Sequence, residues 1–240
     1  MTTLSALVTG SAKRIGREIA IHLAKQGYHV ALHYHQSETE AKQLAHELSL
    51  RYPSQLFPIV RHDLADWENS SALLDQLPAE MLPLHLLINN ASVFEAGNLM
   101  ASTSQLLSRN FAVNFFSPFE LIRSFAIRFD EGQIINLLDV QVTRNESSHA
   151  AYLLAKKALM HLTQMAALEW APRIRVNAIA PGPVYPATDG LSTRFEQVVA
   201  QTPMKTSVDI STILASVDYL MNAKQVTGQV IFADSGAHLT

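Results

Sequence analysis

Short apolar segments alternate along this chain with longer segments of helical periodicity. The apolar segments are rich in Val, Ile and Leu, as expected for strands buried on both faces of a parallel sheet. We expect strands at 4–9, 28–34, 56–61, 84–88, 133–138 and 175–179, with a last apolar run at 229–232. Helices are expected at 14–26, 37–51, after residue 66, within 104–129 and at 150–170. The alternation predicts an α/β fold with a doubly wound parallel sheet of the Rossmann type, in three α/β/α layers.

No repeat, low-complexity tract or block of charge divides the 240 residues, so we expect a single domain over 1–240. Hydrophobic residues make up 48% of the chain, which is enough for a sizeable core. Five of the ten prolines lie between 172 and 203. This stretch favours a loop over the active site, and we expect a substrate loop at about 183–206.

Several classes of protein and site are excluded by composition. The net charge of −3 gives no reason to expect nucleic acid or an anionic membrane as partner. Without cysteine, the chain has no disulfide, no iron–sulfur cluster and no thiolate zinc site. The N-terminus lacks the features of a signal peptide, and no apolar stretch approaches the roughly 20 residues of a membrane-spanning helix. We therefore expect a cytoplasmic protein.

Residues suited to a dinucleotide follow the first and third strands. Gly10 and Gly16 lie in the turn that opens the first helix, where glycine permits tight geometry and helix amides favour a diphosphate. The spacing departs from G-x-G-x-x-G because Arg14 stands between them, so the turn alone is also compatible with an ordinary α/β connection. Asp63 would lie at the carboxyl edge of the sheet, as an adenine contact or as a helix N-cap.

The end of the second strand favours NADPH over NADH. It lacks the Asp or Glu that accepts from the ribose 2′-hydroxyl in NAD sites. A 2′-phosphate would instead find donors in His33, His35 and Ser37, with Lys13 and Arg14 nearby. The two histidines could also suggest a metal, but no third ligand occurs at a convincing spacing, so we expect none.

Tyr152 and Lys156 lie four residues apart in an expected helix, which puts both side chains on one face. A neighbouring ammonium stabilises a phenolate, whose phenol has an ordinary pKa of about 10. The pair is therefore a reasonable proton donor for a carbonyl or imine that receives a hydride. Taken alone, such a helical pair is common and is better explained by a structural role.

Further motifs accompany this pair in a fixed order along the chain. They are the Gly10 turn, Asn89-Asn90-Ala91, Asn114 in a helix, Pro181-Gly182, and the ending Val226-Thr227-Gly228-Gln229 through Asp234-Ser235-Gly236. Together they resemble the short-chain dehydrogenase/reductase family over nearly the whole chain. The resemblance implies a catalytic tyrosine at Tyr152, a lysine at Lys156 that binds the nicotinamide ribose and lowers the tyrosine pKa, and a proton-relay water on Asn114. The expected cofactor-binding set is Gly10, Lys13, Arg14, Ile15, Gly16, His33, Tyr34, His35, Ser37, Asp63, Leu64, Asn90, Ala91, Ser92, Tyr152, Lys156, Pro181 and Gly182.

One position departs from the general family pattern. The usual serine, thirteen residues before the tyrosine, is here Asp139. A damaged, non-catalytic site would explain this change. Pteridine reductases within the family, however, carry aspartate at that place. The chain also resembles them in Thr9-Gly10-x-x-Lys13-Arg14-x-Gly16, in Leu32-His33-Tyr34-His35 and in Asn90-Ala91-Ser92-x-Phe94.

This second resemblance implies an NADPH-dependent reductase that converts a C=N bond of a dihydropterin, of the biopterin, monapterin or folate type, to the tetrahydro form. We expect Phe94 to stack on the pterin and Ser92 to hydrogen-bond the pterin or a cofactor phosphate. Arg14 would reach both pyrophosphate and pterin, and Asp139 and Tyr152 complete the expected substrate set. The alternatives are a carbonyl or 3-oxoacyl-thioester reductase and a non-catalytic NADPH-binding relative.

Family members often form tetramers through the helix that carries the catalytic tyrosine, so we expect a homotetramer. Apolar positions along this segment are Leu159, Leu162, Met165 and Leu168. The same residues could equally face the chain's own sheet.

Overall fold

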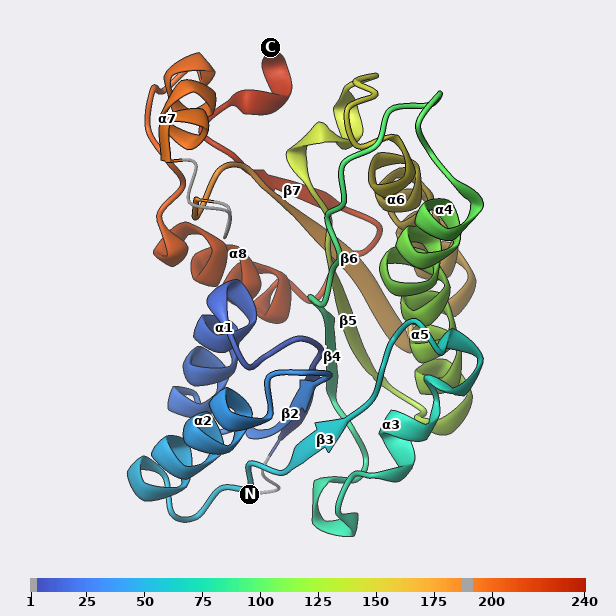
Figure 1. Cartoon of the computed structure of the whole chain (residues 1–240). Helices are drawn as coiled ribbons and strands as arrows, with labels where there is room; N and C mark the ends of the chain where they lie inside the picture. Colours follow the sequence, from blue (N-terminus) through green and yellow to red (C-terminus); the bar gives the residue numbers. More distant parts are fainter. Residues whose placement is uncertain (1–3, 187–191) are drawn as a thin grey trace.

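The computed structural model describes residues 4–186 and 192–240, and seven parallel strands form its sheet in the order β3-β2-β1-β4-β5-β6-β7 (Figure 1). The strands are β1 Ser5–Val8, β2 His29–Tyr34, β3 Ile59–Arg61, β4 Leu86–Asn89, β5 Gly132–Leu137, β6 Ile174–Pro181 and β7 Val230–Ala233. The strand order reverses between β1 and β4, and a crevice is expected outside the carboxyl ends of the strands at such a point.

Helices cover both faces of this sheet. The α-helices are α1 Arg14–Lys25, α2 Glu38–Arg51, α3 Ala72–Asp75, α4 Ser104–Phe111, α5 Ser117–Arg128, α6 Ala150–Trp170, α7 Ser192–Gln201 and α8 Ile210–Asn222. The 3₁₀ and π segments are η1 Trp67–Asn69, η2 Ala79–Met81, η3 Ala112–Phe116, η4 Val140–Thr143 and η5 Ala237–Leu239. Helices α1, α2 and α8 lie on one face, with α4, α5 and α6 on the other (Figure 1). The predicted three-layer, doubly wound fold is confirmed.

Strand β1 illustrates why the strands are mostly apolar. Successive side chains of a strand point to opposite faces of the sheet. Leu7 packs into the core beneath α5 and α6, whereas Ala6 and Val8 pack into the core beneath α1 and α8. Because both faces are covered, most positions are apolar, and a buried polar residue such as Ser5 is held by hydrogen bonds to backbone carbonyls.

The structure departs from the prediction in two helical regions. The expected helix over 104–129 is interrupted by a π-helical segment, η3, between α4 and α5. Helix α8 was not predicted, although its buried residues Ile213, Val217 and Leu220 recur at helical spacing.

Helix α7 lies within the segment 183–206 that was expected to be a loop, of which 187–191 fall outside the described residues. Residues 192–201 contain no proline, and they form a helix between Pro186 and Pro203. A role for this segment toward a substrate stays a prediction.

The apolar positions of α6 divide between two environments. Leu159 and Leu162 are buried in the chain's own core, whereas Met165 and Leu168 are 67% and 86% exposed. Over the described ranges, no helix is long and apolar enough to cross a membrane.

Candidate functional site

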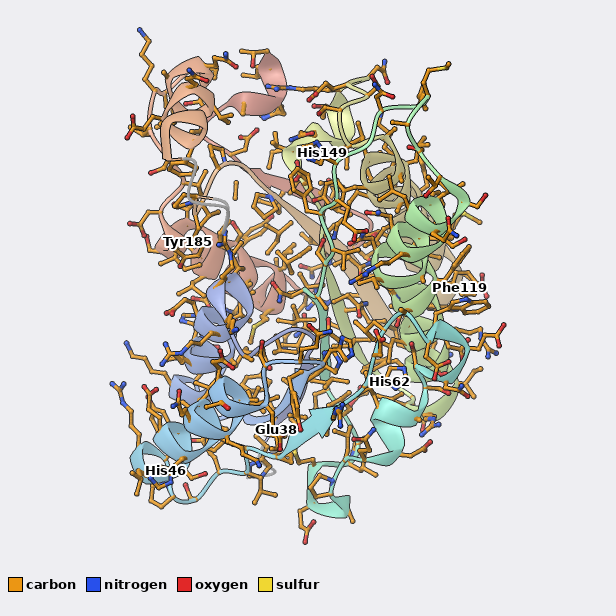
Figure 2. All side chains as sticks on the ribbon, in the orientation of Figure 1. Glu38, His46, His62, Phe119, His149 and Tyr185 are labelled. Carbon is orange, nitrogen blue, oxygen red and sulfur yellow. The ribbon has the colours of Figure 1, made fainter. Side chains whose placement is uncertain are left out.

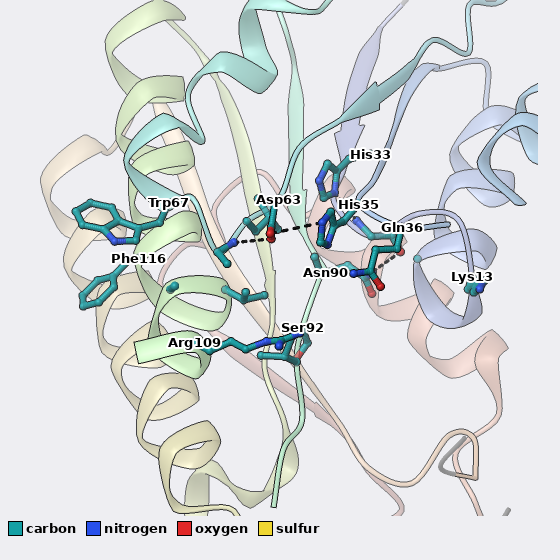
Figure 3. Close-up of a pocket in the computed structure, with 18 of the residues that line it drawn as sticks. Lys13, His33, His35, Gln36, Asp63, Trp67, Asn90, Ser92, Arg109 and Phe116 are labelled. Atoms are coloured by element: carbon teal, nitrogen blue, oxygen red, sulfur yellow. Dashed lines mark hydrogen bonds and ion pairs between the residues drawn. The ribbon is translucent and has the colours of Figure 1, made fainter. Parts of the chain in front are cut away.

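A cleft of about 1050 Å³ opens at the carboxyl ends of the strands, against the start of α1 on one side and α4 on the other (Figure 3). The predicted cofactor-binding residues in its lining are Gly10, Lys13, Arg14, Ile15, Gly16, His33, His35, Asp63, Leu64, Asn90, Ala91 and Ser92. The other six predicted residues lie outside this lining: Tyr34, Ser37, Tyr152, Lys156, Pro181 and Gly182. Tyr34 is buried against Ala12 and Ala41, and Ser37 occupies the N-cap position of α2 without a side-chain capping hydrogen bond.

The turn after β1 is built for close approach. Gly10 has a φ of +63°, in the left-handed region that favours glycine, and a Cβ added there would lie 2.9 Å from the Ala91 Cα. A Cβ on Gly16 would collide with the Gly10 carbonyl oxygen. From β4, the Asn90 side-chain amide donates to the carbonyls of Thr9 at 2.9 Å and Gly10 at 3.1 Å. Asn90 thus fixes the turn, and its predicted contact with a cofactor stays a prediction.

His33 lies at the cleft in a way that disagrees with its predicted role as a phosphate donor. Its Nδ1 accepts from the Gly10 amide at 2.9 Å, and its Nε2 lies 3.1 Å from the His62 carbonyl oxygen. Burial lowers the pKa of His33 to about 4, so the ring is neutral near pH 7. With both ring nitrogens engaged by backbone, the side chain has no donor left for a 2′-phosphate.

Polar groups that remain open to the cleft surround His33. His35 Nε2 lies 3.5 Å from the Asp63 carboxylate (Figure 3), whose other oxygen accepts from the Ala65 amide at 2.9 Å. Asp63 therefore closes a local turn after β3 and is not the N-cap of the next helix, because η1 has Asp66 at that position. The Lys13 ammonium forms a 2.7 Å ion pair with Glu40 of α2. The side chains of His35 and Lys13 are both exposed, so these pairs can rearrange at little cost.

Part of the cleft lining was missed by the sequence analysis. The missed residues are Gln36, Ala65, Trp67, Val93, Gln105, Ser108, Arg109, Ala112, Val113 and Phe116. Polar residues at i, i+3 and i+4 near the start of α4 (Gln105, Ser108 and Arg109) face this space rather than bulk solvent. The polar face of an amphipathic helix normally faces solvent, so nothing in the sequence indicated that these three residues line a cleft. Trp67 could have been predicted more easily as a lining residue, because it follows Asp63 by four residues at the same edge of the sheet.

Three predicted catalytic residues converge on the first turns of α6. The Tyr152 hydroxyl donates to Asp139 Oδ2 at 2.8 Å, and the other carboxylate oxygen accepts from the Gln141 amide at 2.8 Å. The Lys156 ammonium donates to the Leu137 carbonyl at 2.7 Å and lies 5.9 Å from the centre of the Tyr152 ring. Residues from β5, from the loop after it and from α6 thus form one buried cluster.

The electrostatics of this cluster differ from the expectation for Tyr152. Burial, and then the adjacent Asp139 carboxylate, raise the pKa of the Tyr152 phenol well above its usual value instead of lowering it. Burial lowers the pKa of Lys156 to about 8, and Asp139 partly opposes that effect. Tyr152 is therefore a firmly protonated phenol whose hydrogen points to a carboxylate.

Asn114 lies in the π-helical segment η3, and such segments are frequent at functional sites. Its side chain is fully buried and already has partners: it accepts from Ser92 Oγ at 2.7 Å and donates to the Val93 carbonyl at 2.9 Å. The π turn aims Asn114 at the loop after β4, so it orders that loop and Ser92. Its predicted water-holding role stays a prediction.

Aromatic groups border the Tyr152 cluster. The Phe94 ring stacks on His149 with centroids 3.9 Å apart and meets the Tyr152 ring edge-on at 4.7 Å. His149 lies at the start of α6 (Figure 2). Phe94 nevertheless remains about half exposed, so it offers an open apolar surface beside the tyrosine.

Arg14 and Gly182 fix the position of the segment after β6. Arg14 has a φ of +53°, uncommon for a residue with a side chain, and its guanidinium donates to the carbonyls of Tyr185 and Pro186. The guanidinium also lies 5.3 Å from the Tyr185 ring centre. A Cβ on Gly182 would lie 2.7 Å from the Asp234 Cα, so glycine there permits the close packing of β6 on the turn after β7. Contacts of Pro181 and Gly182 with a cofactor stay a prediction.

Within the described part of the chain, no three His, Cys, Asp or Glu side chains are grouped so that they could hold a metal ion.

Comparison with known proteins places this geometry in a family. The family model described as Enoyl-(Acyl carrier protein) reductase matches residues 10–238. A 3-oxoacyl-[acyl-carrier-protein] reductase of Staphylococcus aureus is 32% identical over 245 residues, covering 99% of each chain. Pteridine reductase 1 of Leishmania tarentolae is 31% identical over 279 residues, covering 98% of this chain and 96% of its own.

A solved structure agrees with both relatives. FolM alternative dihydrofolate reductase 1 from Brucella canis, in complex with NADP, superposes with a TM-score of 0.93 at 32% identity, covering 100% of this chain and 95% of the other. The family match extends over nearly the whole chain, and the relatives match it end to end. The chain therefore belongs to the short-chain dehydrogenase/reductase family of oxidoreductases.

Proposed function

We propose that this protein is an NADPH-dependent pteridine reductase, which reduces a C=N bond of a dihydropterin or dihydrofolate to the tetrahydro form. The observation that carries the proposal is the 2.8 Å hydrogen bond from Tyr152 to Asp139, beside the open ring of Phe94. A carboxylate at this place gives the site a charged hydrogen-bond acceptor for the donor–acceptor edge of a pterin. The pteridine reductase and dihydrofolate reductase relatives support the same substrate class.

The residues of the cleft fit a dinucleotide phosphate. The Gly10 and Gly16 turn leaves room that any Cβ would fill, and the start of α1 offers amides and a positive dipole to a diphosphate. Asp63 and Leu64 would hold the adenine, with His35 and Lys13 at the 2′-phosphate. When bound, NADPH supplies the hydride for the C=N bond.

Lys156 and Asp139 would then act on either side of Tyr152. Lys156 would bind the nicotinamide ribose, and its ammonium would offset the charge left when Tyr152 gives its proton to a substrate ring nitrogen. Asp139 holds the Tyr152 hydroxyl in one orientation and carries a negative charge at the substrate's edge. The protein thus contributes orientation and a proton path.

The pterin would lie on Phe94, with Ser92 and Arg14 at its polar edge. An aromatic ring stacks favourably on a flat heterocycle in an offset arrangement. Tyr185 and Pro186, the described start of the expected substrate loop, would border the substrate, since Arg14 holds their carbonyls. We also propose that the protein is a homotetramer.

The second candidate is a 3-oxoacyl-thioester reductase, which the Staphylococcus aureus relative favours at similar identity. A thioester carbonyl needs an uncharged hydrogen-bond donor at residue 139, which aspartate does not provide.

One assay separates the two candidates. NADPH oxidation by the purified protein is followed with dihydrobiopterin, dihydromonapterin, dihydrofolate, a quinone and a 3-oxoacyl thioester. We expect turnover of the pterins, and loss of that turnover in Asp139→Ser. Turnover of the thioester alone would replace the proposal with the second candidate, and NADPH binding without turnover of any substrate would make the chain a non-catalytic relative.

A further inference from the structure

His33 attaches to the turn after β1 by both its side chain and its main chain. Its Nδ1 accepts from the Gly10 amide at 2.9 Å. Its own carbonyl accepts from the Ser11 amide at 3.0 Å and from the Ser11 hydroxyl at 3.3 Å. One residue of β2 therefore determines where two consecutive residues of the proposed diphosphate-binding turn lie.

The hydrogen-bond partners also fix where the ring carries its proton. A backbone N–H can only donate, so Nδ1 must be the unprotonated nitrogen of a neutral ring. The hydrogen then lies on Nε2, where it donates to the His62 carbonyl at 3.1 Å. His62 follows β3 directly, so the ring spans from the turn after β1 to the end of β3 (Figure 3).

Both polar backbone groups of Gly10 are thereby used. His33 holds its amide, and Asn90 holds its carbonyl from β4. The side chain of His33 is 2% exposed, so water cannot replace the ring as an acceptor. A buried amide without a partner loses the hydrogen bond and its solvation together. Gly10 would then be free to leave the left-handed conformation that shapes the turn.

We infer that His33 is a positioning residue for the cofactor: its Nε2-protonated ring holds the Gly10 turn in the shape that receives the diphosphate, and it does not contact the 2′-phosphate. This inference rests on the proposed cofactor. It assigns the 2′-phosphate to two exposed side chains. They are His35, which lies just after β2, and Lys13, which lies just before α1. Loss of the His33 contact should therefore weaken NADPH and NADH alike, because both carry the diphosphate.

Two isosteric substitutions separate the two ring nitrogens. In His33→Asn the amide oxygen takes the place of Nδ1 and still accepts from Gly10. In His33→Gln the amide nitrogen takes the place of Nε2, so the His62 contact survives and the Gly10 contact is lost. Dissociation constants for NADPH and NADH are measured by nucleotide fluorescence. We expect H33Q to bind both dinucleotides about tenfold more weakly than H33N, from the loss of one buried hydrogen bond.

The controls identify the cause of any loss. His46→Gln makes the same change on an exposed histidine of α2, far from the cleft, and should bind like the wild type (Figure 2). His35→Gln should weaken NADPH more than NADH. If H33Q weakened NADPH only, or bound both dinucleotides as H33N does, His33 would not be a positioning residue.

A measurement on the wild type covers the case in which H33Q does not fold. In ¹⁵N-labelled protein, the His33 ring should show an unprotonated Nδ1 and a protonated Nε2, with no titration between pH 5 and 8. The opposite tautomer would overturn the inference. If the wild type had the expected tautomer but bound neither dinucleotide, the proposed cofactor would be refuted. The role of His33 in positioning that cofactor would then be refuted as well.

Discussion

At the scale of single residues, burial determines which groups of the site are charged. Lys156 and Tyr152 are both almost fully buried, and burial shifts their pKa values in opposite directions. It favours the neutral lysine, by lowering its pKa, and the neutral phenol, by raising its pKa. Asp139 is the partly exposed member, and its carboxylate holds the phenol hydrogen. The site therefore rests as a protonated tyrosine beside a carboxylate and a lysine whose pKa is about 8.

The first prediction concerns the proton that Tyr152 holds. Tyr152→Phe removes the hydroxyl and keeps the ring against Phe94. Because general-acid catalysis contributes about 10²–10⁴-fold, we expect kcat for a dihydropterin to fall by roughly that factor. Steady-state kinetics measure the change, and the NADPH dissociation constant serves as the control for folding. A variant with full kcat would mean that water, not Tyr152, donates the proton.

The second prediction follows from the pKa of Lys156, which burial lowers to about 8. The ammonium is present below that pH and is lost above it. If the ammonium binds the nicotinamide ribose, the affinity for NADPH should decrease as pH rises from 7 to 9. Binding titrations at several pH values measure this, with Lys156→Met as a variant whose affinity should be lower and flat across the range. A wild-type affinity that does not change through pH 8 would contradict the assignment.

At the scale of elements, the sequence predicted the strands, α1, α2 and α6 well, because their signals are local. The glycine turn and the Tyr152–Lys156 spacing are local too. What it missed depends on register and on packing between segments. His33 looks like a polar strand end until the pairing of β2 with β3 brings it beside His62. The π-helical turn at Asn114 is likewise invisible in a continuous helical periodicity.

The third prediction tests the glycine turn as an element. Gly16→Ala in a helix normally stabilises by about 1 kcal/mol. Here the added Cβ would collide with the Gly10 carbonyl and with the Asn90 side chain, so we expect destabilisation and weaker NADPH binding instead. Thermal unfolding and a binding titration measure the two effects. Unfolding at a higher temperature than the wild type would show that the turn is not as close as described.

At the scale of the whole molecule, the sheet separates two tasks. Its two faces pack into the core, and the cleft and the Tyr152 cluster lie at its carboxyl edge. The outer surface of α5 and α6 has neither function, yet it carries exposed apolar side chains. They are Phe119 and Ile127 on α5, and Leu154, Met165 and Leu168 on α6. Two neighbouring helices with such residues are typical of an interface between subunits.

The fourth prediction concerns that interface. If α5 and α6 pair between subunits, Met165→Glu with Leu168→Glu would bury unpaired charges there, and like charges would face each other across a two-fold axis. We expect the double variant to lose the tetramer and run as a smaller species in light scattering after gel filtration. Leu50→Glu, on the equally exposed surface of α2, is the matched control and should keep the wild-type mass. If the double variant kept the wild-type mass, the interface would have to lie elsewhere on the surface. If the wild type were a monomer, the proposed tetramer would be wrong. The substitutions leave the inward-facing residues of α6, Leu159 and Leu162, in the core. We therefore expect the fold to be kept, so that a change in mass reports on the association of subunits.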